Sequence, residues 1–147
     1  MPKKLIVVRG PSGAGKTTWA NRVKSKLNGI FVASCVVASA DHYFTHNGVY
    51  HFDTTKLGAA HETCRKEAHE AMSHGIDVVI LDNTNVSRYM FKEYIDYAIE
   101  FQYCVIERTL GLNLDVDTLV ARGTHNVPRH KVESMLRRLH DSIRNRG

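Results

Sequence analysis

The sequence has no apolar run long enough to cross a bilayer, so we expect no membrane-spanning helix and no membrane partner. Its first residues, Met1 to Lys4, lack the apolar core and cleavage site of a signal peptide, and nothing predicts export. Only three cysteines are present, and they form no C-x-x-C pair. Isolated thiols favour a reducing compartment, so we expect a cytoplasmic protein. The histidines lack metal-binding spacing, and no zinc site is expected.

Acidic residues are scarcer than basic ones. Against 20 Lys and Arg stand 15 Asp and Glu, which gives a net charge of +5. The whole surplus lies between Arg122 and the C-terminus, where seven basic residues face only Glu133 and Asp141. A basic segment attracts polyanions such as nucleic acid. It would equally complement the dipole at the C-terminal end of a helix.

One stretch, from Gly10 to Thr17, matches the phosphate-binding pattern G-x-x-x-x-G-K-[ST] at every fixed position, between an apolar run and a helical pattern. Its glycines allow backbone angles that turn N–H groups inward around phosphate oxygens, and the following helix adds its positive dipole end. The pattern predicts that Lys16 reaches the β- and γ-phosphates and that the Thr17 hydroxyl binds Mg²⁺. The predicted nucleotide-binding residues are Gly10, Pro11, Ser12, Gly13, Ala14, Gly15, Lys16, Thr17 and Thr18.

Four apolar segments have the pattern of buried parallel strands, and we predict strands over residues 4–8, 34–39, 76–81 and 103–109. Asp41 follows the second strand and Asp82 the third, and in open sheets ligands bind beyond the carboxyl ends of the strands. Asp41 therefore suits a general base near the γ-phosphate, although it would equally cap the next turn. Asp82 has the position of a carboxylate that holds Mg²⁺, directly or through water.

Helical patterns alternate with these strands. They predict helices over residues 17–27, 53–74, 87–101, 115–122 and 128–145. In the second helix, apolar spacing predicts a buried face made of Leu57, Ala60, Cys64, Ala68 and Ala71. The other faces of that helix carry side chains that we expect to be solvated, namely His61, Arg65 and His69.

Residues 42–53 hold two Tyr, two Phe and three His, and Asn47-Gly48 is a hairpin-turn signal. The rings of this segment, Tyr43 among them, either stack on a nucleobase or pack as a small hairpin, the interpretation that we favour for Phe44 and Phe52.

Three further polar residues follow the third strand at the predicted ligand edge. Asn83 and Asn85 either bind substrate or cap the next helix. Arg88 falls in the predicted first turn of that helix, where the dipole disfavours a cation. A phosphate ligand would account for this position, and so would plain solvent exposure.

These motifs together resemble the P-loop kinase domain of polynucleotide 5′-hydroxyl kinases, and especially their short single-domain relatives labelled AAA-type ATP-binding proteins. The resemblance is carried by residues 10–17, 39–44, 57–61 and 81–85, and by Arg122, Val127, Pro128 and Met135. It implies an α/β P-loop NTPase/kinase fold with a parallel sheet of four or five strands between helices. It also implies ATP and Mg²⁺ on Lys16 and Thr17, Asp41 as the base, and Arg122 in a lid around residues 122–129.

The chain departs from phage polynucleotide kinases at Phe44, where they carry an arginine that grips the phosphate of the acceptor. Arg88 and Arg129 are candidates to replace it. We predict a single P-loop kinase domain over residues 1–147. No obligate protein partner is predicted, and the expected location is the interior of a phage-infected or other host cell.

The function expected is ATP-dependent transfer of the γ-phosphate to a hydroxyl of nucleic acid, DNA or RNA. The acceptor would be a 5′-hydroxyl end or a hydroxymethyl group on a modified DNA base. A P-loop kinase for a nucleoside, sugar or antibiotic is the second hypothesis. A nucleotide-dependent switch or binding module without phosphoryl transfer is the third.

Overall fold

A computed structural model describes residues 2–145 and has a parallel sheet at its centre. Neighbouring strands follow the order β2-β5-β1-β6 and all pair in parallel. A two-stranded antiparallel hairpin, β3-β4, stands apart from this sheet. The bounds are β1 (Lys4–Arg9), β2 (Cys35–Ala38), β3 (Thr45–His46), β4 (Val49–Tyr50), β5 (Val78–Asp82) and β6 (Cys104–Thr109).

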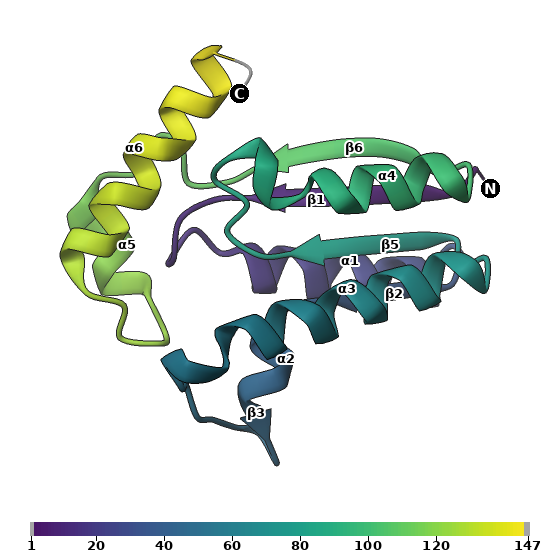
Figure 1. Ribbon diagram of the computed structural model, residues 1–147, viewed down its shortest axis with the longest axis horizontal. Helices are drawn as coiled ribbons and strands as arrows, with labels where there is room; N and C mark the ends of the chain where they lie inside the picture. Colours follow the sequence, from purple (N-terminus) through teal and green to yellow (C-terminus); the bar gives the residue numbers. More distant parts are fainter. Residues whose placement is uncertain (1, 146–147) are drawn as a thin grey trace.

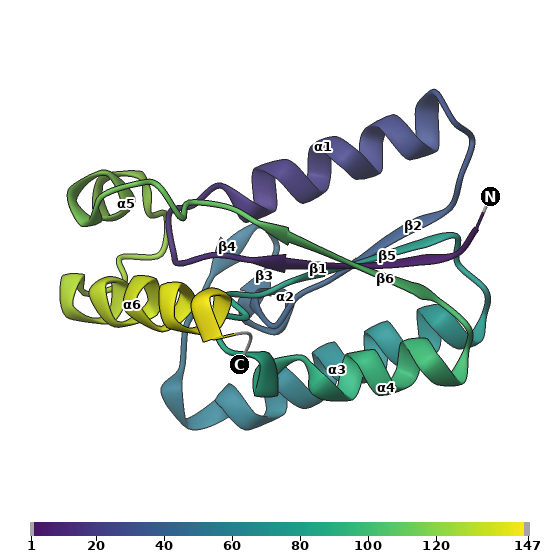
Figure 2. The same cartoon turned by 90° about the horizontal axis from the view of Figure 1, so that it is seen from above.

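Helices cover both faces of the sheet. Figure 2 shows α1 on one face and α3 with α4 on the other, whereas α5 and α6 lie beyond the carboxyl end of β1. The α-helices are α1 (Lys16–Gly29), α2 (Asp41–Phe44), α3 (Leu57–Ser73), α4 (Lys92–Glu100), α5 (Val116–Arg122) and α6 (Arg129–Asn145). Two 3₁₀ helices, η1 (Thr54–Lys56) and η2 (Arg88–Met90), precede α3 and α4. The predicted α/β fold with a four-stranded parallel sheet is confirmed (Figure 1).

The central strands send alternate side chains to two cores. Leu5 and Val7 of β1 pack toward α3 and α4, while Val8 packs toward α1 with Trp19 and Val23. Strand β5 is buried along its whole length. A strand covered on both faces must be apolar throughout, and this is why these segments were recognisable in the sequence.

The structure corrects three details of the sequence-based prediction. Residues 87–101 do not form one helix, because η2 ends at Met90 and α4 begins at Lys92, with the fully buried Phe91 between them. Leu57 stands at the first position of α3 and is 39% exposed, so it does not belong to the buried face. The last strand begins at Cys104 and forms the edge of the sheet, and most of its side chains are exposed.

The aromatic segment forms the small hairpin that we favoured. Asn47 and Gly48 have φ angles of 52° and 79°, the left-handed conformations of a tight hairpin turn. Phe44 is buried in the core against α3, whereas Phe52 stays half-exposed. Arg146 of the basic C-terminal segment lies outside the described residues. In residues 2–145 no helix is long and apolar enough to span a membrane.

Candidate active site

The loop between β1 and α1 has the backbone geometry that its glycines predict. Gly13 and Gly15 have φ angles of 86° and 89°, which side chains with a Cβ rarely adopt. Gly15 directly precedes α1, so the free N–H groups of the first helical turn open toward the loop. Lys16 folds back along the loop and donates a hydrogen bond from Nζ to the Pro11 carbonyl at 3.0 Å. The loop is therefore shaped to receive phosphate groups.

Thr17 and Asp82 meet at the carboxyl edge of the sheet, as predicted. The Thr17 hydroxyl donates to Asp82 Oδ2 at 2.9 Å. Burial raises the pKa of the Asp82 carboxyl, against the opposing effects of this hydrogen bond and the Lys16 charge. Burial likewise lowers the pKa of Lys16, although Asp82 and Asp41 counteract it. The three charged groups therefore share one electrostatic environment.

These oxygen donors fit Mg²⁺. This ion usually takes one or two protein oxygens and completes its octahedron with phosphate and water oxygens. The hydroxyl of Thr17 and the carboxylate of Asp82 are such a pair, next to a phosphate-shaped loop. Within residues 2–145 no three His, Cys, Asp or Glu side chains gather as a metal-binding group.

Asp41 is the first residue of α2 and lies in the same environment. Its side chain is 50% exposed, so a substrate can reach it. Tyr50 Oη lies 3.4 Å from Oδ1, and His125 Nε2 lies 3.9 Å from Oδ2. Within the described residues no Lys or Arg forms an ion pair with this carboxylate. The alternative role of Asp41 as a helix cap finds no support, because among residues 2–145 no backbone N–H donates to its side chain.

The asparagines after β5 hold backbone in place. Asn83 accepts the Ala40 N–H at 2.9 Å through Oδ1, and so fixes the chain just before Asp41. Asn85 is only 1% exposed, and its amide donates to the Val8 carbonyl at 2.9 Å. The structure therefore gives Asn85 a structural role, in place of both alternatives considered in the sequence, a substrate contact and a helix cap.

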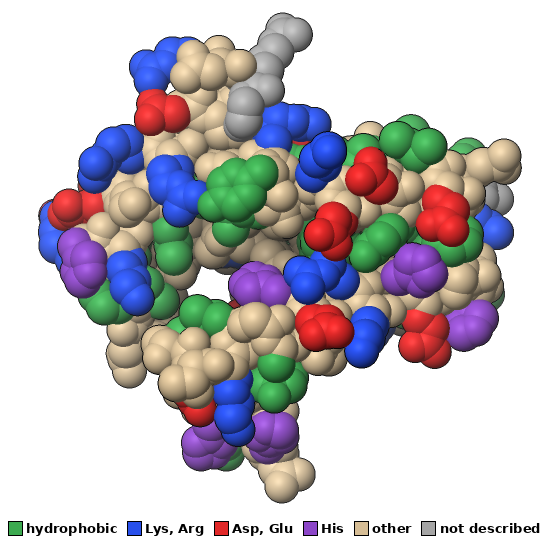
Figure 3. All heavy atoms as spheres, in the orientation of Figure 1, with side chains coloured by type: hydrophobic (Ala, Val, Ile, Leu, Met, Phe, Trp, Pro, Cys, Tyr) green, Lys and Arg blue, Asp and Glu red, His purple; other side chains and the backbone are tan. Residues whose placement is uncertain are grey.

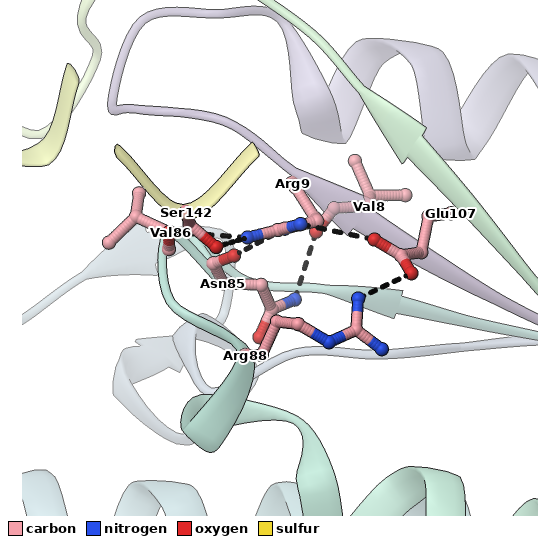
Figure 4. A network of polar contacts seen from close by, with 7 residues as sticks. All are labelled: Val8, Arg9, Asn85, Val86, Arg88, Glu107 and Ser142. Carbon is pink, nitrogen blue, oxygen red and sulfur yellow. Dashed lines mark hydrogen bonds and ion pairs between the residues drawn. The ribbon is translucent and has the colours of Figure 1, made fainter. Parts of the chain in front are cut away.

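Arg88 is likewise engaged within the fold. Its guanidinium donates to Glu107 Oε2 at 2.7 Å (Figure 4). The same guanidinium lies over the Phe91 ring, 5.2 Å from the ring centroid. A protein carboxylate thus takes the place of the phosphate ligand that we considered in the sequence. Arg129 forms an ion pair with Asp117 of α5, which ties the start of α6 to α5, and a second ion pair with Glu133 of its own helix. Tyr43 is partly buried against the core. Substrate contacts by Arg129, Tyr43 and Asn83 stay predictions.

Arg9, which sequence reasoning did not single out, lies at the centre of the network in Figure 4. It is the last residue of β1 and is almost fully buried. Its guanidinium donates to Asn85 O, Val86 O and Ser142 Oγ and pairs with Glu107 at 3.0 Å. One side chain therefore joins the start of the phosphate loop to β6 and to α6.

Helices α5 and α6 and the loop between them lie against the phosphate loop. We call these three elements together the lid, which is a larger unit than the lid around residues 122–129 that the resemblance implied. A Cβ on Gly13 would come within 2.0 Å of the Leu119 carbonyl oxygen of α5, so the two backbones are in direct contact. A Cβ on Gly15 would lie 3.4 Å from Nη2 of Arg122. The Arg122 guanidinium therefore stands beside the phosphate loop, where the resemblance implied it. A cavity of about 250 Å³ separates Ser12 from lid residues Leu119 and Asn126.

Two histidines complete the surroundings of Asp41. His125 was not singled out in the sequence, and His61, which we expected to be solvated, is partly buried. His125, at the tip of the lid loop, places its ring centroid 3.7 Å from that of Tyr50. His61 of α3 has its pKa lowered by burial and by Arg65, with the charge of Asp41 opposing. Figure 3 shows a hollow between the lid and the part of the molecule that carries the hairpin. The histidines that we noted in the aromatic segment lie in residues 42–53, whereas His61 and His125 come from other segments.

Comparison with known proteins places the chain in a family. A family model described as an AAA domain matches residues 5–141. The chain belongs to this AAA domain family. Human NEDD4-binding protein 2 is 33% identical over 134 residues, which are 90% of this chain and 7% of that protein. The chain thus spans only a small part of this relative's length.

Solved structures share the fold at low sequence identity. A chain in the Pnkp1/Rnl/Hen1 RNA repair complex is 15% identical, with a TM-score of 0.74 over 97% of this chain and 46% of its own length. Kti12 of Chaetomium thermophilum, in complex with ADP-AlF3, is 19% identical, with a TM-score of 0.62 over 91% and 79%. The APS kinase CysC of Mycobacterium tuberculosis is 17% identical, with a TM-score of 0.55 over 98% and 99%. The AAA domain chain therefore has the fold of P-loop kinases.

Proposed function

We propose that this AAA domain protein is an ATP-dependent kinase that transfers the γ-phosphate of ATP to a hydroxyl group of nucleic acid. The acceptor would be a 5′-hydroxyl end or a hydroxymethyl group on a modified base. The observation that carries the proposal is the position of Asp41. Its half-exposed carboxylate has no Lys or Arg partner in residues 2–145 and lies within electrostatic range of Lys16 and Asp82. A nucleotide switch has no use for such a base.

The residues have complementary roles in this reaction. Asp41 takes the proton of the acceptor hydroxyl as its oxygen forms the new bond to the γ-phosphorus. The bond from that phosphorus to the β,γ-bridging oxygen breaks, and ADP leaves. Lys16 and Arg122 neutralise charge on the transferring group, and loop N–H groups hold the remaining phosphates. Thr17 and Asp82 would hold Mg²⁺, which would supply positive charge to offset that of the phosphates.

Charge and similarity support nucleic acid as the acceptor. Lys131, Arg137 and Arg138 of α6 are exposed, and no carboxylate of residues 2–145 pairs with them. Figure 3 shows Lys and Arg side chains gathered over α6, beside the hollow. The likeness to a chain of an RNA repair complex points the same way. The likeness to an APS kinase over 98% of this chain favours a second candidate, a kinase for a small-molecule hydroxyl.

The test is transfer of label from γ-labelled ATP with Mg²⁺. The acceptors are 5′-hydroxyl DNA and RNA oligomers, duplex DNA with hydroxymethylated bases, nucleosides and adenosine 5′-phosphosulfate. Asp41→Asn should lower the rate by about 10²–10⁴-fold, the usual contribution of a general base, while ATP affinity is retained. Asp96→Asn, which changes an exposed acid of α4, is the matched control and should leave the rate unchanged.

The outcomes separate the hypotheses. Label on an oligomer, lost in the Asp41 variant, supports the proposal. Label on small molecules alone favours the second candidate. Nucleotide binding without transfer to any acceptor would refute the kinase assignment.

A further inference from the structure

One lid side chain makes two contacts at the proposed acceptor position. His125 places its ring centroid 3.7 Å from that of Tyr50, with 32° between the planes. The same imidazole points Nε2 toward Asp41 Oδ2 at 3.9 Å. The flat face of the imidazole thus lies on the Tyr50 ring, and its polar edge lies beside the Asp41 carboxylate. A nucleotide whose hydroxyl is to be phosphorylated has these same two features, a planar base and a polar group that must reach Asp41.

Tyr50 is the fixed half of this arrangement. Its hydroxyl lies 3.4 Å from Asp41 Oδ1, and its ring packs against Phe44 and stacks with Phe52. Burial and the Asp41 charge raise the pKa of Tyr50 to about 12, so the phenol remains a neutral hydrogen-bond donor. The ring is therefore anchored to the hairpin and to the predicted base at once.

His125 is the movable half. It stands in the exposed loop between α5 and α6, which holds Thr124 and Asn126 beside it, both exposed as well. Its contacts to Tyr50 and Asp41 are the ones that the described residues give it. The body of the lid is held separately, through the buried side chains of Leu119 and Val132. Displacing the His125 ring therefore does not require undocking the lid.

We infer that Tyr50 and Asp41 form the acceptor subsite and that this subsite takes a nucleobase-sized planar ring joined to the accepting hydroxyl. His125 occupies the subsite until the acceptor displaces the imidazole ring. The inference deepens the proposed function and rests on it. The base stacks on Tyr50, as bases do on aromatic platforms, and the hydroxyl reaches Asp41. Because His125 competes for the same surface, the acceptor binds only to the fraction of molecules in which the ring has left. An acceptor without a planar ring gains nothing from Tyr50.

Binding is tested first, without ATP. The imidazole NMR signals of ¹⁵N-labelled protein are recorded while thymidine, adenosine or a short 5′-hydroxyl oligonucleotide is added, and His125→Gln assigns the relevant signals. The nucleosides and the oligonucleotide should shift the His125 signals toward those of an exposed imidazole, whereas free ribose should not. Unmoved His125 signals at nucleoside concentrations that saturate the protein would overturn the inference.

Kinetics with the oligonucleotide acceptor then separate displacement from a positive role of His125. His125→Ala should lower KM for the acceptor about 3–10-fold and leave kcat within about twofold, because the competitor is removed. Tyr50→Leu should raise KM about tenfold or more, and Tyr50→Phe should raise it less because the ring remains. His130→Ala, an exposed histidine of α6, is the control. A raised KM for His125→Ala, or an unchanged KM for Tyr50→Leu, contradicts the subsite.

The two arms keep this inference apart from the proposed function. If wild-type protein phosphorylates no acceptor but nucleosides still shift His125, the kinase assignment fails and the ring-binding site stands. If transfer occurs while neither the signals nor the KM values respond as described, the subsite fails and the kinase assignment stands.

Discussion

Replacing Arg9 by methionine should strongly destabilise the protein, although Arg9 contacts no predicted substrate. Its side chain is 3% exposed and makes four hydrogen bonds at the end of β1. The acceptors are the carbonyls of Asn85 and Val86, the Ser142 hydroxyl and the Glu107 carboxylate. Methionine replaces the aliphatic part of the arginine side chain, but it lacks the guanidinium and donates no hydrogen bond.

The magnitude follows from burial. Breaking a buried, hydrogen-bonded ion pair by removing one partner costs about 3–5 kcal/mol, mostly because polar groups are left buried without partners. Glu107 is 34% exposed and keeps its bond to Arg88, so the charge left behind is partly solvated. The lower end of the range, about 3 kcal/mol, is therefore expected. Exposed ion pairs contribute only about 0–1 kcal/mol.

Arg88→Met is a matched control, since Arg88 pairs with the same Glu107 and lies over the same Phe91 ring, 5.2 Å away against 5.0 Å for Arg9. The two residues differ in exposure, because the Arg88 side chain is 38% exposed and the Arg9 side chain 3%. Urea unfolding should show the midpoint for Arg9→Met lower by roughly 1–3 M at an m-value of about 1–3 kcal/mol/M, with little change for Arg88→Met. Equal losses in the two variants would show that burial of Arg9 is not what stabilises the network.

Four further outcomes are expected. Asp82→Asn should raise the unfolding temperature of the nucleotide-free protein at neutral pH. The pKa of Asp82 is raised in the folded protein, so the stability that this carboxyl contributes at acid pH is lost as the pH rises through that pKa. An unchanged pH dependence of the unfolding temperature in the variant would contradict this. The same variant should weaken Mg²⁺-dependent ATP binding, measured by calorimetry. Gly13→Ala should destabilise the protein by about 2 kcal/mol or more in urea, because the new Cβ would meet the Leu119 carbonyl at a positive φ; a loss below that size would mean that α5 can shift aside. Arg122→Ala should lower kcat more than ATP affinity, and an unchanged kcat would remove Arg122 from the predicted reaction.

The parts of the site that the sequence predicted are those set by local rules. The phosphate loop requires glycines at positive φ within one short segment, so its sequence pattern can be recognised without knowing which residues the loop contacts in the fold. Thr17 and Asp82 are 65 residues apart, yet their meeting was predictable, because parallel strands end at one edge of the sheet. Buried strands such as β5 are apolar throughout and were recognised for the same kind of reason.

The parts that sequence reasoning missed depend on partners set by the tertiary fold. Arg88 lies beside Glu107 because η2 passes close to the edge strand β6. The residues near Arg88 in the sequence do not predict that Glu107 is its partner. Asn85 has a φ of 45° and turns its amide back to β1, a geometry that a pattern of asparagines does not specify. His125 reaches Tyr50 across a separation of 75 positions, through the docking of a lid on a hairpin.

The contacts of the phosphate loop indicate where the molecule can open. Gly10 and Gly13 approach the backbone carbonyls of Leu110 and Leu119 more closely than a Cβ would permit, and Arg9 ties the start of the loop to α6. Close-packed contacts of this kind transmit displacement rather than absorb it, so we expect the loop and the lid to move as one body. The hairpin meets that body where the exposed ring of His125 lies on the partly buried ring of Tyr50. Because exposed contacts are the least costly to break, the seam between lid and hairpin is where an acceptor would enter without disturbing the bound nucleotide.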